Sequence, residues 1–138
     1  MNKKQRNIPK RGERQKPSQM RGIPHRGEIW VVEFLKSKES RKFRRPCLVI
    51  SNDIQNEYGK WIVVVAMTTQ DIEIVEPFEV FIKNTLETGL DEPSKLKFNY
   101  PRTVDRERLK KHLGVANKKI MEQAEKAWKI AFDWWSNE

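Results

Sequence analysis

The sequence predicts an α+β domain in which a small, strongly bent antiparallel sheet is followed by helices at the C-terminus. Between residues 28 and 100, short runs rich in β-branched and aromatic residues alternate with polar loops, which is typical of strands. After residue 105 the apolar residues recur at three- and four-residue spacing, which is typical of helices. A chain of 138 residues suits one domain of this class.

Five segments are expected to form strands. The strongest is 61–67, with the sequence WIVVVAM. The apolar run 46–51 suits a strand buried on both faces, and Pro46 suits only its first position because proline lacks an N–H group. Asn, Asp and Gly residues indicate a turn over 52–60, and 68–76 is a further polar loop. The expected strands are 28–34, 46–51, 61–67, 78–82 and 94–100.

Two helices are expected to follow the strands. Asp105 is a suitable N-cap for a helix over 106–113, and Gly114 is a suitable stop. Asn117 is a suitable N-cap for an amphipathic helix over 118–134. We assign the apolar face of this helix to core or dimer contacts rather than to base stacking. Its members are Ile120, Ala124, Ala127, Trp128, Ala131 and Trp135.

The positive charge is concentrated at the N-terminus. Residues 1–26 contain nine Lys and Arg residues and one acid, Glu13, so they hold +8 of the formal net charge of +9. With few large apolar groups, residues 1–25 are expected to form a flexible basic arm, and residues 26–138 the folded domain. Such an arm attracts polyanions such as RNA, or it is simply a solubilising terminus.

Cysteine and histidine content limits the chemistry. Cys47 is the only cysteine and lies in an apolar run, so we expect a buried, inert thiol and no cysteine-type zinc site. His25 and His112 are both expected to be solvent-exposed, which does not favour a two-histidine ribonuclease mechanism. No metal or cofactor is expected. No segment approaches the roughly 20 apolar residues of a membrane span, so we expect a cytoplasmic protein without membrane contact.

A series of short motifs resembles the MazF/PemK family of toxins from toxin–antitoxin systems. Each motif is weak alone, but all occur in order over about residues 26 to 133, at workable spacing. They are Arg26-Gly27-Glu28-Ile29-Trp30, the run from Arg45 to Asp53, Thr68-Thr69-Gln70, Pro77-Phe78-Glu79-Val80, Arg102-Thr103-Val104-Asp105, and Leu113-Gly114.

The resemblance implies a fold, an activity and partners. The implied fold is a small SH3-like antiparallel β-barrel with packed helices. The implied activity is sequence-specific, metal-independent cleavage of single-stranded RNA, and the implied assembly is a homodimer. The implied partner is an antitoxin protein whose acidic, flexible segment covers the RNA groove.

Arg45 and Thr68 match the catalytic arginine and threonine of the family. In RNA cleavage the 2′-OH attacks the adjacent phosphate, leaving a 2′,3′-cyclic phosphate and a 5′-OH, so DNA is spared. The Arg45 guanidinium suits the developing phosphate charge, because it presents a planar fork of donors that stays protonated. The Thr68 hydroxyl can donate to a phosphate oxygen or hold the 2′-OH. The alternatives are an arginine that pairs with a surface carboxylate and a threonine that bonds its own loop.

Further residues are candidates for RNA contact. The basic loop before Arg45 combines cations with an aromatic ring, which suits a single strand, although a plain solvated charge run is the alternative. Ser51 and Asn52 follow the neighbouring strand, and Gln70 follows Thr68. The RNA-binding candidates are Lys42, Phe43, Arg44, Ser51, Asn52, Gln70 and Arg102.

The chain departs from the family before Arg102, where Asn99, Tyr100 and Pro101 replace the usual acid-Gln-apolar trio. Contacts from this strand, and with them the cleavage sequence, therefore do not carry over. The departure leaves open a second function, a non-catalytic RNA- or protein-binding module on the same barrel, as in the gyrase-poisoning relatives of this fold.

Overall fold

The computed structural model describes residues 22–35 and 44–134, which form one bent sheet and two α-helices. Asn52 caps the short helix α2 by accepting the Gln55 N–H, and Asn117 caps α3 by accepting the Ile120 N–H. In chain order the elements are β2 (Glu28–Glu33), β3 (Arg44–Val49), α2 (Asp53–Tyr58), β4 (Trp61–Thr68), β5 (Glu79–Ile82), β6 (Ser94–Asp105), the 3-10 turn η1 (Arg106–Arg108), β7 (Leu109–Val115) and α3 (Lys118–Phe132).

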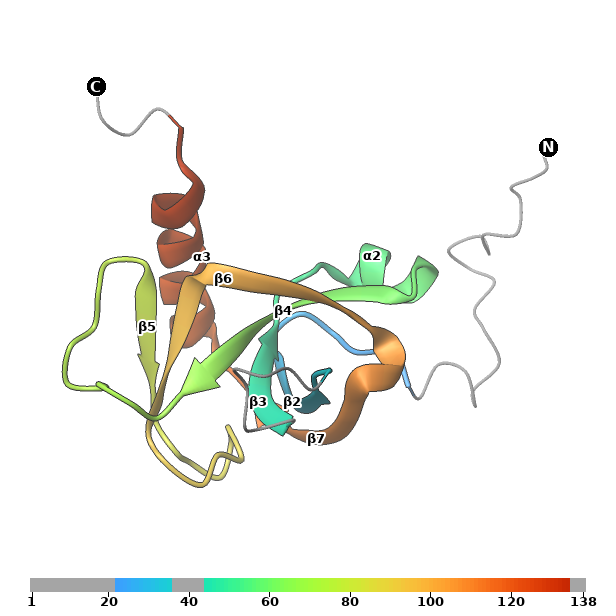
Figure 1. Ribbon diagram of the computed structural model, residues 1–138, viewed down its shortest axis with the longest axis horizontal. Coiled ribbons are helices and arrows are strands. Elements are labelled where there is room, and N and C mark those ends of the chain that lie inside the picture. Colours follow the sequence, from blue (N-terminus) through green and yellow to red (C-terminus); the bar gives the residue numbers. More distant parts are fainter. Residues whose placement is uncertain (1–21, 36–43, 135–138) are drawn as a thin grey trace.

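The six strands form a single antiparallel sheet in the order β5-β6-β4-β3-β2-β7. Because side chains alternate between faces, the sheet buries two apolar clusters. One includes Leu48, Val65 and Leu96 and is covered by Ala124 and Ala127 of α3. The other includes Val32, Cys47 and Val64 and lies on the opposite face, inside the bend of the sheet. Figure 1 shows α3 beside β5 and β6, and α2 at the far end of β4.

The pairing of β4 with β6 is interrupted by a bulge in β6, a feature that bends a strand locally. Val65 pairs with Pro101 and Met67 with Leu96, so Ala66 alone lies opposite residues 97–100. The strand was expected to stop at residue 100 but continues to Asp105. Pro101 is tolerated there because β5 pairs only with residues 94–97, so one side of the strand has no neighbour at Pro101.

Pro46 is tolerated for the same reason. The strand β3 begins at Arg44, so Pro46 is its third residue rather than its first. Residues 44–46 pair with β2 alone, and pairing with β4 starts at Cys47. The missing N–H therefore falls where the strand has one neighbour.

The edge strands β5 and β7 are not paired with each other in the described part of the chain, so the sheet is an open version of the expected barrel. The loop after β5 bridges the gap, and the Val115 N–H donates to the Glu87 carbonyl at 2.9 Å. Two glycines allow this approach. A Cβ at Gly114 would lie 2.1 Å from the Glu87 oxygen, and one at Gly89 would lie 2.1 Å from the Leu113 oxygen.

Two expected elements are wrong. The helix predicted over 106–113 is the short turn η1 followed by β7, because Leu109 and His112 pair with Val32 and Trp30 of β2. Asp105 does accept the Glu107 N–H, but it caps only one turn. The turn predicted over 52–60 is instead the helix α2. The helix α3 agrees with its predicted start. None of the helices in the described part of the chain is long and apolar enough to cross a bilayer.

Candidate active site

Arg45 and Thr68 lie at the same end of two adjacent strands. The β3–β4 pairing begins with Cys47 opposite Ala66, and Arg45 and Thr68 each lie two residues beyond this pair on their own strands. Opposed residues of an antiparallel pair share a face of the sheet. That face is the inner one, because Cys47 belongs to the inner apolar cluster and Ala66 packs against it. Arg45 is exposed and Thr68 is half-buried, so both polar groups are available at the rim of the inner cluster.

Arg102 joins this end from β6. It pairs with Val64 of the inner cluster, and its guanidinium carbon lies 4.6 Å from the centroid of the buried Phe34 ring. Burial raises the pKa of the Cys47 thiol well above its usual range, although the nearby charges of Arg45 and Arg102 act in the opposite direction. Both guanidinium groups therefore lie near Cys47. The thiol is neutral and buried, as the sequence predicted.

The Thr68 hydroxyl accepts the Gln70 N–H at 3.1 Å. This is the local backbone bond that sequence analysis named as the alternative role. The contact uses the oxygen as an acceptor, and a hydroxyl hydrogen remains available to donate. Gln70 is exposed in the turn that follows β4.

A buried charge cluster supports this end of the sheet from β5 and β6. The Glu79 carboxylate lies 3.0 Å from the Lys95 ammonium and 3.5 Å from that of Lys97. Burial alone would raise the pKa of Glu79. The Glu76 N–H and the two lysines outweigh burial and hold that pKa below its usual value.

Ser51 and Asn52 lie at the opposite end of β3, so the structure does not bring these RNA-binding candidates to Arg45 and Thr68. The Ser51 hydroxyl donates to Asn56 Oδ1 at 2.5 Å and accepts the Val63 N–H at 3.0 Å. The Asn52 side chain accepts the Gln55 N–H as the cap of α2. Their hydrogen-bonding groups therefore serve the fold.

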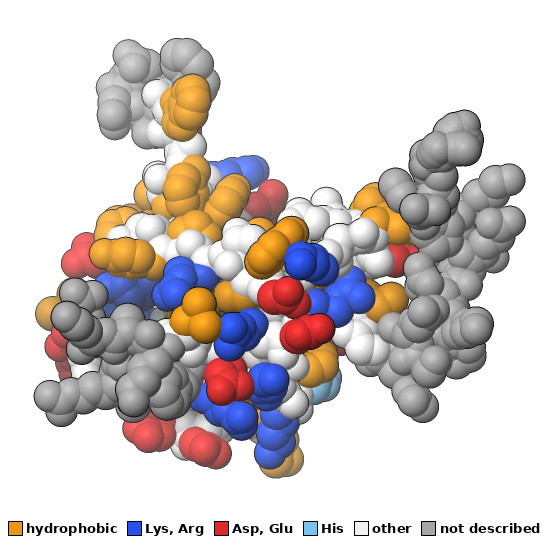
Figure 2. All heavy atoms as spheres, turned by 45° about the vertical axis from the view of Figure 1, so that its right-hand side comes forward, with side chains coloured by type: hydrophobic (Ala, Val, Ile, Leu, Met, Phe, Trp, Pro, Cys, Tyr) orange, Lys and Arg blue, Asp and Glu red, His pale blue; other side chains and the backbone are white. Residues whose placement is uncertain are grey.

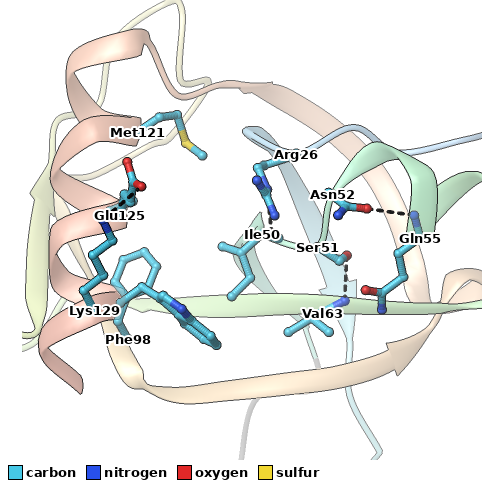
Figure 3. A pocket seen from close by; sticks show the side chains of 12 residues that line it. Arg26, Ile50, Ser51, Asn52, Gln55, Val63, Phe98, Met121, Glu125 and Lys129 are labelled. Carbon is cyan, nitrogen blue, oxygen red and sulfur yellow. Dashed lines mark hydrogen bonds and ion pairs between the residues drawn. The ribbon is translucent and has the colours of Figure 1, made fainter. Parts of the chain in front are cut away.

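Both residues line a cavity of about 670 Å³ between α3 and the start of α2. Figure 3 shows Arg26, Ile50 and Asn52 on one side of it and Met121 on the other. The Arg26 guanidinium donates to the Ile50 carbonyl at 2.8 Å. This cavity is separate from the Arg45 end of the strand, and its walls are mostly apolar side chains and capped backbone.

Of the RNA-binding candidates in the basic loop before Arg45, only Arg44 lies in the described residues. Its guanidinium lies 3.7 Å from the Glu33 carboxylate, and the side chain is exposed. Lys42 and Phe43 lie outside the described residues.

Both histidines are exposed, as expected, and each has a partner. The His25 ring lies 3.2 Å from the Asp53 carboxylate. His112 lies on β7 rather than on a helix, and its ring packs against Trp30 with centroids 5.2 Å apart. Neither histidine reaches the Arg45 end by these contacts.

Lys97 and Tyr100 were not predicted as site residues. Tyr100 is 64% exposed in the β6 bulge, and the Lys97 ammonium lies 5.8 Å from its ring centroid. The signal was present, because a tyrosine beside alternating lysines differs from an ordinary buried strand. Figure 2 shows Lys and Arg side chains spread over one face of the molecule, interrupted by acidic and apolar ones. Within residues 22–35 and 44–134, no three His, Cys, Asp or Glu side chains are grouped to hold a metal ion.

Comparison with known proteins gives one family. The model of PemK-like, MazF-like toxins of type II toxin–antitoxin systems matches residues 25–132. Endoribonuclease MazF9 of Mycobacterium tuberculosis is 33% identical over 116 residues, which cover 80% of this chain and 98% of that protein.

Solved structures show the same fold. The Mycobacterium tuberculosis toxin MazF-mt6 superposes with a TM-score of 0.64 at 20% identity, covering 77% of this chain and 96% of that one. A mycobacterial endoribonuclease in complex with its cognate antitoxin superposes with a TM-score of 0.62 at 20% identity, covering 78% and 93%.

Proposed function

The chain belongs to the family of PemK-like, MazF-like toxins of type II toxin–antitoxin systems, and we propose that it is an endoribonuclease that cleaves single-stranded RNA. The observation that carries the proposal is that Arg45 and Thr68 each lie two residues beyond the Cys47–Ala66 pair, on the same face of adjacent strands. A guanidinium and a hydroxyl so placed can both donate to one phosphate.

The proposed reaction needs no metal. The 2′-OH of the RNA attacks the phosphate and loses its proton, and the P–O5′ bond breaks as the 5′-oxygen gains one. The products are a 2′,3′-cyclic phosphate and a 5′-OH, with no net change in protons. Arg45 stabilises the charge that develops on the non-bridging oxygens and is placed to protonate the leaving oxygen, directly or through water. Thr68 donates its hydroxyl hydrogen to the phosphate or holds the 2′-OH.

The neighbouring residues form the proposed RNA surface. Arg102 and Lys97 supply cations from β6, the strand paired with β4, and Tyr100 supplies an exposed ring on which a base can stack. Gln70 is placed to contact a base edge. Lys42, Phe43 and Arg44 remain proposed RNA contacts from the loop before Arg45.

The proposed assembly follows the family. Curated relatives are named endoribonucleases, and one structural relative was solved with its cognate antitoxin. We propose that this chain acts as a homodimer in the cytoplasm and is neutralised by an antitoxin. An acidic, flexible antitoxin segment would complement the cations Arg45, Lys97 and Arg102.

Residues 1–25 are proposed to act as an RNA-tracking arm. The end of this segment contacts the domain, since Pro24 accepts from the Asn56 amide at 3.1 Å. Deleting residues 1–22 would remove eight Lys and Arg residues. RNA affinity should then fall, and its dependence on salt should flatten because fewer counterions are released. An unchanged salt slope would contradict a role of the arm in RNA binding.

The experiment is cleavage of a mixed-sequence RNA by the purified protein in EDTA, with Arg45→Ala and Thr68→Ala alongside and the product ends analysed. The expected result is cutting by the wild type about 10²- to 10³-fold faster than by either variant, with cyclic phosphate and 5′-OH ends. Equal cutting by all three proteins would refute the site. RNA binding without products under any condition would favour the non-catalytic binding module.

A further inference from the structure

We propose that the buried ion pair between Lys95 and Glu79 is a positioning element for the Thr68 end of β4. This inference rests on the proposed ribonuclease function and adds residues that do not touch RNA. The pair would hold Thr68, and the loop of residues 69–78 that carries Gln70, in the arrangement needed for cleavage.

The Glu79 carboxylate joins three points around the start of β5. One of its oxygens lies 3.0 Å from the Lys95 ammonium and accepts the Glu76 N–H at 3.0 Å. Its other oxygen lies 3.5 Å from the Lys97 ammonium. The side chain is 2% exposed, so the carboxylate depends on these partners in place of water.

Lys95 connects the carboxylate to the proposed site. It is the direct cross-strand partner of Thr68, so the two side chains share a face of the sheet. Its ammonium also donates to the Ile74 carbonyl at 2.8 Å, in the middle of the 69–78 loop. One ammonium group therefore ties β5 and the loop to the residue opposite Thr68.

Stability alone does not explain a charged pair at this place. Replacing a buried ion pair by apolar side chains of similar size is often neutral or stabilising. The pair adds a defined geometry, because each contact is a hydrogen bond or ion pair that fixes one point of the loop. Since the Lys95 side chain is only 6% exposed, it acts through the loop and not on the substrate.

The experiment uses the double variant Glu79→Leu/Lys95→Met, which removes both charges together and so avoids leaving either one unpaired in the interior. The expected result is a melting temperature close to wild type, with kcat for RNA cleavage reduced about 10- to 100-fold, as small misplacements of reacting groups produce. KM should change little. Amide exchange in residues 69–78 should accelerate. The matched control is Glu125→Leu/Lys129→Met, which removes an exposed pair of 3.4 Å on α3 and should leave kcat unchanged.

A double-mutant cycle separates positioning from general stability. In a Thr68→Ala background the Glu79→Leu/Lys95→Met change should cause little further loss of rate, because the group that it positions is already absent. Full additivity, or a wild-type kcat in the double variant, would overturn this inference while the ribonuclease stands. Absence of cleavage by the wild type would instead overturn the proposed function and this inference with it.

Discussion

The two ends of the β3–β4 pair carry similar polar residues, but the side chains at the two ends use their hydrogen-bonding groups differently. At one end, Ser51 and Asn52 use their side chains to cap α2 and to hold the Val63 backbone. At the other end, Arg45 is exposed and Thr68 keeps a hydroxyl hydrogen free to donate. Residue type alone therefore does not identify a functional site. What matters is whether hydrogen-bonding capacity remains after folding.

Arg45→Ala should produce the largest effect and should act on rate alone. Loss of one donor to a developing oxyanion costs about 10²- to 10³-fold in kcat. The side chain is exposed, so the melting temperature should hardly move. Single-turnover cleavage together with thermal melting checks both parts. Arg45→Lys is the matched variant, and it should recover little because it keeps the charge but loses the fork.

Ser51→Ala should show the reverse pattern. The Ser51 hydroxyl satisfies the Val63 N–H and the Asn56 side chain in the interior, so its loss should destabilise the fold by about 1–3 kcal/mol. Chemical denaturation measures this change. The rate of the folded variant should equal that of wild type. A large fall in kcat without a loss of stability would place Ser51 in the site and undo the contrast between the two ends.

Each end also has an exposed aromatic residue beside a lysine, so the two ends can be compared for RNA binding. Tyr100 lies near the Thr68 end, whereas Trp61 lies at the other end of β4 with the Lys60 ammonium 4.9 Å from its ring centroid. Stacking of one base is worth about 1–3 kcal/mol, so Tyr100→Ala should weaken RNA binding by about 5- to 100-fold. Trp61→Ala should not. Fluorescence anisotropy with a 2′-O-methyl RNA, which cannot be cut, gives both affinities, and equal losses would contradict the assignment.

Each end also holds a carboxylate whose pKa is lowered by folding. For Asp53, burial favours a higher pKa, but the Arg26 N–H and His25 outweigh it. Glu79 behaves alike with its lysines. A lowered pKa gives stability that is present above the ordinary value of about 4 and lost as pH falls through the folded value.

Acid unfolding should therefore depend more on Glu79 than on Asp53. Glu79 is almost fully buried, whereas the Asp53 side chain is 59% exposed and its interactions are screened by water. Denaturation between pH 2 and 7 should show a shallower pH dependence in Glu79→Gln than in Asp53→Asn. The opposite order would mean that the His25–Asp53 contact supports the fold more than the buried cluster does.

Hydrophobic pattern predicted the strands β2, β4 and β5 and the helix α3, because each has a consistent period and clear end signals. It failed over 106–113, where charged residues such as Lys110 and Lys111 suit a helix surface as well as an exposed strand. Pairing with β2 decides between them, and pairing is not a local property. Pro101 wrongly suggested the end of a strand for the same reason. A strand that is paired on one side only can contain a proline whose missing N–H would point to the unpaired side.

For the candidate site, motif order selected Arg45 and Thr68, and the structure places both at the same end of the neighbouring strands β3 and β4. Ser51 and Asn52 were grouped with them, but the length of β3 separates these residues from Arg45. The ion pair between Lys95 and Glu79 was not predicted. Their pairing depends on β5 and β6 being neighbours, and Lys95 in the sequence is one lysine in a basic stretch.

The most direct test of the central claim is cleavage in EDTA of one mapped RNA and of the same RNA with a 2′-deoxy nucleotide at the scissile position. We predict that the wild-type protein cuts the all-ribose RNA and leaves the 2′-deoxy RNA intact. Arg45→Ala should cut neither RNA at a comparable rate. Cleavage of the 2′-deoxy substrate at the same position would show that the nucleophile does not belong to the RNA, and would contradict the mechanism proposed for Arg45 and Thr68.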